Sequence, residues 1–407
     1  MRPDAARVST VHGARPKAAS VALLLLAIAV MAYVYIRLGD DHSDIGAYHR
    51  DALAFFAPGA AARPLPPEYP PLALVPFSVT LIPIGDYGVV FIGLMAVLFF
   101  GGYALIASQC SRSAANAYAV YMVVSGPWTL LGRFDLVPSL VVLGAILAAG
   151  RGRWRIAYAL LAIGVLLKLY PIFLVPLFAI EQWRLARPRA LTAKALAPMA
   201  TGPGVFALIV LAGLGASALV DPSGWLGPIR YAIQRPMQVE SVPSTLLWLM
   251  SGFGAAARVE HSFNSVNVVA AGSGLFDALT LVALSVGSVA IWMWQAAGRL
   301  SLRRAALACL CLVIATNRVF SPQYLVWLLP LVAIELGLDP LWIGICILTF
   351  LVYPNLYSLA GLVDGQTATT FAGTFLIAIA VRNGLFLFAT WKAARGPVGA
   401  GAAVAAT

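Results

Sequence analysis

DDHSDIGAYHRDALAFFAPGAAARPLPPEYPPL, residues 40–72, is the one long polar and acid-rich passage near the start of a chain that is otherwise almost continuously apolar. It directly follows an apolar run, Val21–Ile36. If that run crosses a bilayer, the carboxylates and histidines of residues 40–72 lie at the membrane surface that the chain has just reached. We therefore interpret this stretch as an outer loop that carries the chemistry of a membrane enzyme.

The composition sets the class of protein. Hydrophobic residues make up 61% of the 407 residues, charged residues only 11%, and the mean hydropathy is +0.88. Charged residues are about 25% of a typical soluble domain. Long, unalternating apolar blocks favour helices over a barrel, because lipid offers backbone groups no partners and a barrel strand alternates. The sequence predicts an all-α polytopic membrane protein.

The formal net charge of +11 does not indicate a nucleic-acid partner. The basic residues stand in short clusters between apolar blocks, as the positive-inside rule predicts for a membrane protein. Residues 1–18 read as a cytoplasmic N-terminal segment before an uncleaved first helix. We expect one domain over residues 1–395 and a disordered Gly- and Ala-rich tail over 396–407.

The apolar blocks predict about twelve transmembrane helices with both termini on the same side. Residues 69–84 are apolar but short and rich in proline, and counting them as a span would reverse every later segment. We therefore expect a re-entrant or interfacial segment there. The predicted helices lie near 19–36, 87–107, 115–131, 134–150, 155–168, 171–184, 199–220, 274–296, 304–319, 323–337, 340–357 and 370–392.

This topology places most of the 27 basic residues inside, including the clusters at 151–155 and 183–194. Only four of the 16 acidic residues fall inside, namely Asp4, Glu181, Glu335 and Asp339. Acids scarcely influence topology, so their enrichment outside needs another reason. An active site on the extracytoplasmic face of the plasma (inner) membrane would supply one.

Four polar segments meet on the predicted outer face: residues 40–69, 132–135, 168–171 and 317–324. The long outer segment 221–273 adds further polar side chains, and its residues 244–253 predict an amphipathic helix on the membrane surface. Transfer from a lipid phosphate needs a carboxylate that takes a proton from the acceptor hydroxyl. It also needs cations that neutralise the departing phosphate. We expect Asp44 to be the base, with Asp41 second.

Several motifs stand in a defined order: Asp44 and Tyr48 in a D-x-x-x-Y pattern, Tyr69-Pro70-Pro71-Leu72, Gly132–Asp135, Lys168–Pro171, and RPMQVES at 235–241. Together, over about residues 19–392, they resemble glycosyltransferase family 87. That resemblance implies the GT-C fold, an outer active site and Asp44 as base. Its characterised members are polyprenol-phosphate-mannose-dependent mannosyltransferases of actinobacterial cell envelopes. Many relatives have Gly-Gln where this chain has Gly132-Arg133, which leaves the role of Arg133 open.

The sequence and the resemblance together predict transfer of a hexose, mannose by resemblance, from a polyprenyl-phosphate donor to a hydroxyl of a lipid-linked glycan acceptor, with inversion. We expect no cofactor; a divalent metal held by the acids and histidines of residues 40–49 is an open alternative. A transporter or flippase of a lipid-linked sugar is the rival reading, and it would need polar groups near mid-membrane. The residues expected to bind substrate are Tyr48, Arg50, Glu68, Tyr69, Arg133, Asp135, Lys168, Tyr170, Arg235, Glu240, His261, Arg318 and Gln323.

Each of these side chains also has a plain structural reading. Ser43 and Asp44 are good helix caps, and a lysine near a helix end, such as Lys168, can extend its ammonium to the interface. Arg133 and Asp135 could pair with each other.

Overall fold

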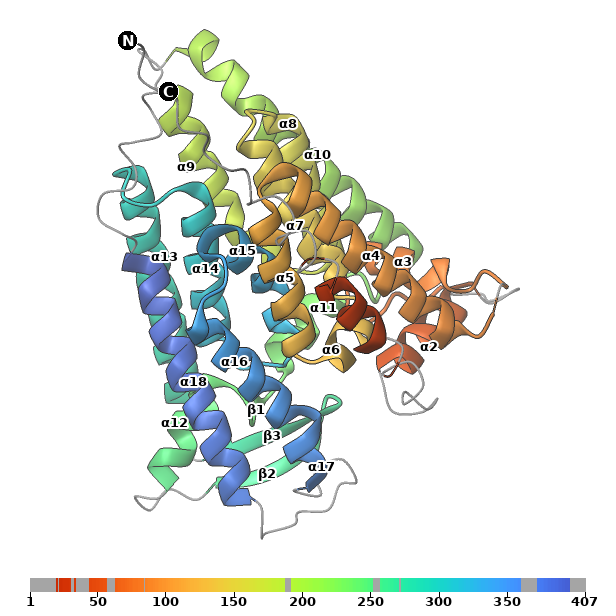
Figure 1. Ribbon diagram of the computed structural model, residues 1–407. Coiled ribbons are helices and arrows are strands. Elements are labelled where there is room, and N and C mark those ends of the chain that lie inside the picture. Colours follow the sequence, from red (N-terminus) through yellow and green to blue (C-terminus); the bar gives the residue numbers. More distant parts are fainter. Residues whose placement is uncertain are drawn as a thin grey trace, which may run out of the picture.

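The computed structural model describes residues 20, 22–30, 33, 44–56, 63–83, 85–186, 192–251, 257–270, 272–359 and 372–395. Asp41 and the two expected terminal segments, 1–18 and 396–407, lie outside the described residues. The chain folds into a bundle of helices with one small sheet at its lower end in Figure 1.

The larger helices run along the bundle and are α4 (Tyr87–Gln109), α5 (Arg112–Val124), α7 (Leu136–Ala149), α8 (Trp154–Leu167), α9 (Val175–Ala186), α10 (Ala193–Val220), α13 (Ser273–Ala296), α14 (Leu302–Thr316), α15 (Tyr324–Leu336), α16 (Pro340–Phe350) and α18 (Ala372–Arg395). Four are long and apolar enough to cross a membrane, by length and composition: Tyr87–Gln109, Met199–Val220, Ser273–Ala296 and Gly373–Arg395. Four shorter apolar helices accompany them. This is a polytopic helical membrane protein, as expected; the count of twelve spans stays a prediction.

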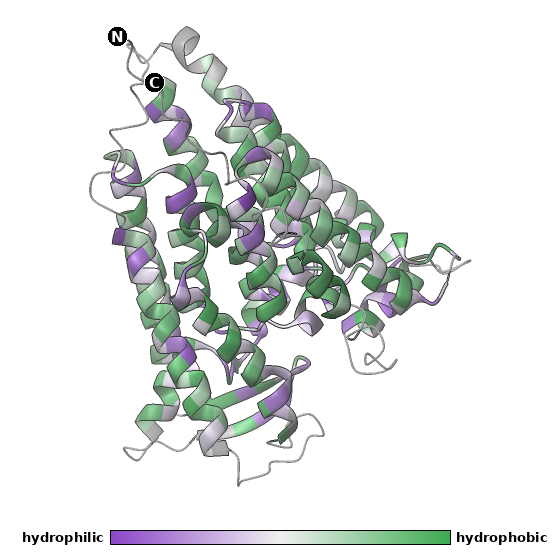
Figure 2. Cartoon of the chain, in the orientation of Figure 1, coloured by the Kyte–Doolittle hydropathy of each residue, from purple (hydrophilic) through white to green (hydrophobic). Residues whose placement is uncertain are grey.

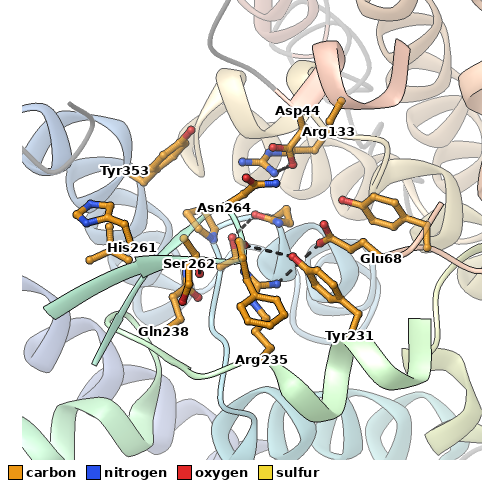
Figure 3. A pocket seen from close by; sticks show the side chains of 18 of the residues that line it. Asp44, Glu68, Arg133, Tyr231, Arg235, Gln238, His261, Ser262, Asn264 and Tyr353 are labelled. Carbon is orange, nitrogen blue, oxygen red and sulfur yellow. Dashed lines mark hydrogen bonds and ion pairs between the residues drawn. The ribbon is translucent and has the colours of Figure 1, made fainter. Parts of the chain in front are cut away.

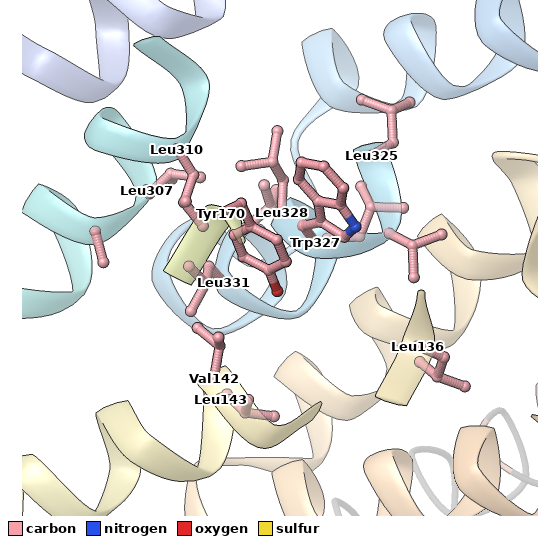
Figure 4. Close-up of a cluster of buried hydrophobic side chains, with 14 of the residues drawn as sticks. Leu136, Val142, Leu143, Tyr170, Leu307, Leu310, Leu325, Trp327, Leu328 and Leu331 are labelled. Carbon is pink, nitrogen blue, oxygen red and sulfur yellow. The ribbon is translucent and has the colours of Figure 1, made fainter. Parts of the chain in front are cut away.

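Apolar side chains cover most of these helices, and hydrophilic ones gather at helix ends and in the sheet (Figure 2). The centre of the bundle is closely packed: Tyr170 stacks on Trp327 with ring centroids 4.2 Å apart, among leucines of α14 and α15 (Figure 4). Such dense packing fixes the helix ends that carry polar groups.

Two predicted helices are interrupted. Residues 115–131 were expected to form one helix, but α5 ends before Ser125-Gly126 and α6 (Pro127–Gly132) follows. Gly126 has φ 117°, which glycine tolerates, and Pro127 stands at a helix start, where its missing N–H costs nothing. The expected helix 340–357 breaks near Pro354: a π-helix, η3 (Leu351–Leu356), with Tyr353 in a non-helical conformation, precedes α17 (Tyr357–Leu359).

The stretch expected as a loop contains a helix, α2 (Asp44–Phe56). Its residues Ile45, Tyr48 and Ala52 repeat every three to four positions and are all buried, so one face of the helix packs inward. Tyr48 stacks on Phe77 at 4.3 Å. A loop prediction missed this helix because its polar residues occupy the other face.

The described residues 69–83 contain no helix long enough to cross a bilayer. They form a 3₁₀ turn, η1 (Pro71–Ala73), and a six-residue helix, α3 (Leu74–Val79). At 1.5 Å rise per residue, α3 covers only about 9 Å, far less than the ~30 Å hydrocarbon layer. The expected non-spanning segment is confirmed, and α3 packs beside α2.

The predicted outer segment 221–273 holds a small antiparallel sheet that the sequence did not predict. Its strands are β1 (Met237–Gln238), β2 (Ala257–Ser262) and β3 (Ser265–Ala270), in the order β1-β3-β2. Phe263 and Asn264 form the β2–β3 turn, both with positive φ, as a tight hairpin turn requires. The segment also holds α11 (Gly227–Gln234) and α12 (Val242–Ser251). Helix α12 overlaps the helix expected at 244–253.

Interactions between chain segments agree with the predicted sidedness. Arg304 donates to the carbonyls of Lys392 and Ala393 and lies 3.9 Å from Glu335, so three predicted inner segments meet. The predicted outer segments meet one another in turn, through Asp44–Arg133 and Arg235–Glu68. Both sets of predicted neighbours therefore lie together in the fold.

Candidate active site

A cavity of about 810 Å³ lies where the predicted outer segments meet. Figure 3 shows three groups around it: Asp44 with Arg133, Glu68 with Tyr231 and Arg235, and His261 with Tyr353. Its lining comes from α2, the 67–69 turn, the end of α6, α11 and β1, the β2–β3 hairpin, residues 321–323, and the η3–α17 bend. The predicted site residues that line it are Asp44, Arg50, Glu68, Tyr69, Arg133, Arg235, Glu240, His261 and Gln323.

Asp44 and Arg133 form an ion pair across the cavity wall. Asp44 is the first residue of α2, and Arg133 follows the last residue of α6 with an extended backbone that turns its side chain away from the helix. Their side chains are 28% and 18% exposed, so the cavity reaches both. The pairing keeps the Asp44 carboxylate beside a cation that a phosphate could also bind.

Arg235 is held loosely. Its nearest contact to Glu68 is 3.8 Å, its guanidinium lies 5.7 Å from the Tyr231 ring centroid, and its buried Nε has no hydrogen-bond partner. A guanidinium carries five N–H donors, so much of this group's capacity is left for a ligand. Burial, and then the charge of Glu68, raise the pKa of Tyr231, whose hydroxyl therefore stays a proton donor.

Glu240 is saturated by the protein. Arg382 of α18 donates to its carboxylate at 2.7 Å and Tyr357 donates to the other oxygen at 3.0 Å. Both partners of the ion pair are at most 1% exposed, and burial raises the pKa of Glu240 while Arg382 opposes that shift. Asn383 donates to the Glu240 and Ser241 carbonyls. Glu240 thus anchors the wall that carries Arg235.

A second buried network lies behind the cavity, centred on Oδ1 of Asp135, whose buried Oδ2 has no hydrogen-bond partner. Lys168 and the Trp327 indole both donate to Asp135, each at 2.6 Å, and Asp135 is 1% exposed. The Lys168 ammonium also lies 5.0 Å from the Phe134 ring centroid. Tyr170 is buried against Trp327, and Tyr48 is fully buried. The expected substrate residues Tyr48, Asp135, Lys168 and Tyr170 do not line the cavity; they pack the turn that presents Arg133.

Arg318 also serves the scaffold. It pairs with Asp277 at 2.8 Å and donates to the carbonyls of Ile233 and Arg235. Arg318 is therefore absent from the cavity lining and instead fixes the backbone at Arg235.

The sequence model of glycosyltransferase family 87 matches residues 68–322, more than half of the chain. The chain belongs to glycosyltransferase family 87. A search of solved structures finds "Crystal Structure of ArnT from Cupriavidus metallidurans bound to Undecaprenyl phosphate", with 16% sequence identity, 92% of this chain and 76% of that chain covered, and a TM-score of 0.48. No curated protein gives a significant match.

Sequence reasoning missed several residues of this family 87 site. The hairpin residues Ser262–Val266, Tyr231 and Tyr353 line the cavity, but no motif marks them. Arg382 had a usable signal: a charged residue inside an apolar helix needs a buried partner. Asp51 lacked such a signal, because only the fold shows that it lies seven positions after Asp44 on one helix.

The described residues of the family 87 protein contain no group of three or more His, Cys, Asp or Glu side chains placed to hold a metal ion. His42 and Asp41, which the metal alternative also invoked, lie outside the described residues. The charges that reach the cavity are carboxylates and guanidinium groups, suited to hydroxyl and phosphate ligands.

Proposed function

We propose that this family 87 protein transfers a hexose from a polyprenyl-phosphate sugar to a hydroxyl of a lipid-linked glycan, on the extracytoplasmic face of the plasma membrane. Mannose is the proposed hexose, from the resemblance to characterised relatives. The observation that carries the proposal is the Asp44–Arg133 ion pair in the wall of a cavity that also holds Arg235. A carboxylate paired with one arginine, with a second arginine in the lining of the same cavity, supplies both groups that the transfer needs.

The donor phosphate binds Arg133 and Arg235 in this proposal. Arginine matches phosphate geometry with two parallel N–H donors, and Arg235 has an unpaired Nε. Lys168, whose charge Asp135 already balances, stabilises the fold instead. The donor's apolar chain lies along the apolar helices of the bundle.

Asp44 is the proposed general base. When the donor phosphate draws Arg133 toward itself, the carboxylate of Asp44 becomes free to accept a proton. The acceptor oxygen then attacks the anomeric carbon and transfers its proton to Asp44. The bond from that carbon to the phosphate oxygen breaks, and its electron pair leaves with the polyprenyl phosphate. A single displacement of this kind inverts the anomeric carbon.

The test is transfer by membranes with and without the protein, supplied with radiolabelled polyprenyl-phosphate sugars and analysed for new glycolipid. Asp44→Asn should lower kcat by about 10²- to 10⁴-fold, the usual contribution of a positioned base. Donor binding and folding should persist, because asparagine keeps the shape of the side chain. Wild-type turnover in this variant would exclude Asp44 as the base, and absence of new glycolipid with any donor would refute the function itself.

A further inference from the structure

Asp51 lies on the same side of α2 as Asp44 and lines the same cavity. Seven residues separate them, or roughly 10 Å along a helix axis at 1.5 Å per residue. Gly46 and Ala47, which also line the cavity, stand between them and project little side chain. Side chains therefore protrude little into the cavity between these two carboxylates, which are about two sugar rings apart.

Asp51 differs from the other carboxylates of the cavity lining in having no counter-ion. Asp44 is paired with Arg133, Glu68 with Arg235, and Glu240 with Arg382. Asp51 makes neither a hydrogen bond nor an ion pair with the part of the chain that the structure describes, although it is partly buried. Asp51 lines the cavity, and an ionised carboxylate offers two acceptor oxygens with about four lone-pair sites.

The surroundings of Asp51 favour a neutral ligand over an anion. Glu68, from the 67–69 turn, is the acid whose charge acts on Asp51, and Arg50 on its own helix is the cation that acts on it. From α4, Tyr87 faces it; α3, which also packs on α2, has no ionisable side chain. Burial first, and then Glu68, raise the pKa of Asp51 to about 6, while Arg50 lowers it. A phosphate would be repelled by Asp51 and Glu68 together, whereas hydroxyl groups would donate to the free oxygens.

We propose that Asp51 accepts hydrogen bonds from hydroxyl groups of a hexose and thereby selects the sugar that the cavity holds. The inference rests on the proposed function in taking that hexose to belong to the donor or to the acceptor. Asp51 binds and orients the sugar, while proton transfer stays with Asp44.

The experiment compares the wild type with Asp51→Ala, Asp51→Asn and the control Asp86→Asn, using a polyprenyl-phosphate hexose as donor and octyl hexopyranosides as acceptors. Asp86 caps α4 outside the cavity, and asparagine caps a helix equally well, so the control makes the same chemical change without touching the site. Folding of each variant is checked by size-exclusion chromatography.

Asp51→Ala should raise KM for one substrate by about 10- to 100-fold, the value of a hydrogen bond to a charged group, with little change in kcat. The substrate whose KM rises identifies the source of the hexose. Because the pKa is raised to about 6, the wild-type KM should be lowest above pH 6 and rise as acidification protonates the carboxylate. In Asp51→Asn, KM should lose that dependence on pH.

A fall in kcat with both KM values unchanged would overturn the inference and make Asp51 a proton-transfer group. Unchanged kinetics in Asp51→Ala would overturn it as well. If the wild type transfers no sugar, the proposed function fails, and saturation-transfer NMR with methyl hexopyranosides decides about Asp51 separately. Saturation transfer to the sugar in the wild type but not in Asp51→Ala supports it; equal signals in both, or none in the wild type, refute it.

Discussion

Replacing Arg382 by methionine should destabilise the protein strongly, although Arg382 lies outside the cavity lining. Arg382 and Glu240 are at most 1% exposed, and Arg382 donates to the carboxylate and to the carbonyl of Glu240. Removing one partner of a buried ion pair leaves an uncompensated charge, which typically costs about 3–5 kcal/mol. Against the usual 5–15 kcal/mol of folding stability, that loss is large.

The assay is denaturant unfolding of the detergent-solubilised protein, followed at pH 7.5 and pH 5. Burial already raises the pKa of Glu240, and loss of Arg382 removes the charge that opposes this shift. A carboxylate with a raised folded-state pKa stabilises the fold when protonated, and that stability is lost as pH rises through the folded pKa. Arg382→Met should therefore be closer to wild-type stability at pH 5 than at pH 7.5.

Two further variants make the reasoning refutable. Arg382→Met combined with Glu240→Gln should recover at least about 2 kcal/mol, because the buried negative charge is gone. Lys392→Met is the matched control, since Lys392 lies on the same helix and its ammonium is 45% exposed beside Asp339. If Arg382→Met unfolds within about 1 kcal/mol of the wild type at pH 7.5, the pair does not hold the cavity wall together.

Other perturbations separate ligand-binding charges from scaffold charges. Arg235→Ala should raise donor KM by about tenfold or more, since a charge-assisted hydrogen bond is lost. Arg230→Ala, on helix α11 just before Arg235, should not raise it, and steady-state kinetics with labelled donor measures both variants. Lys168→Met should lower the denaturant midpoint because Asp135 loses its counter-ion, but leave donor KM unchanged in the folded protein; a rise in donor KM would return Lys168 to the phosphate site. EDTA treatment should leave the transfer rate unchanged, because the proposed reaction uses no metal, and a rate restored by added Mg²⁺ or Mn²⁺ would refute that.

The helical membrane fold and the meeting of the outer segments were predictable from the sequence, because both follow from apolar length and charge distribution. Helix interruptions at Gly126 and Pro354 depend on local backbone chemistry that a hydropathy pattern averages away. The β2–β3 hairpin was not predictable in this way. Its strands are six residues long and stand inside a polar segment, so no clear alternation marked them.

The candidate site was predicted unevenly for a physical reason. Sequence spacing can bring charged residues to one face, but it does not show which of them the protein neutralises itself. Asp135 and Lys168 read from the sequence like Asp44 and Arg133, two charged residues near helix ends. Only the fold shows that Asp135 is buried and accepts from a second donor, Trp327, besides Lys168, whereas the cavity reaches Asp44 and Arg133.

Burial together with strong hydrogen-bond donors is therefore the property that divides these polar residues by role. Glu240 and Asp135 have strong donors at short distance and are only 1% exposed, so a ligand that replaced those donors would have to break buried bonds, although Oδ2 of Asp135 has no partner. Arg235 and Asp51 keep unused donors or acceptors at the cavity, so a ligand can bind them without that cost. Asp44 and Arg133 stand between these cases, because each satisfies the other until a phosphate competes for the arginine. That intermediate state suits a base that should act only when donor is bound. In Arg133→Gln, the Asp44 carboxylate should be free whether or not donor is bound. The same variant should also bind donor more weakly.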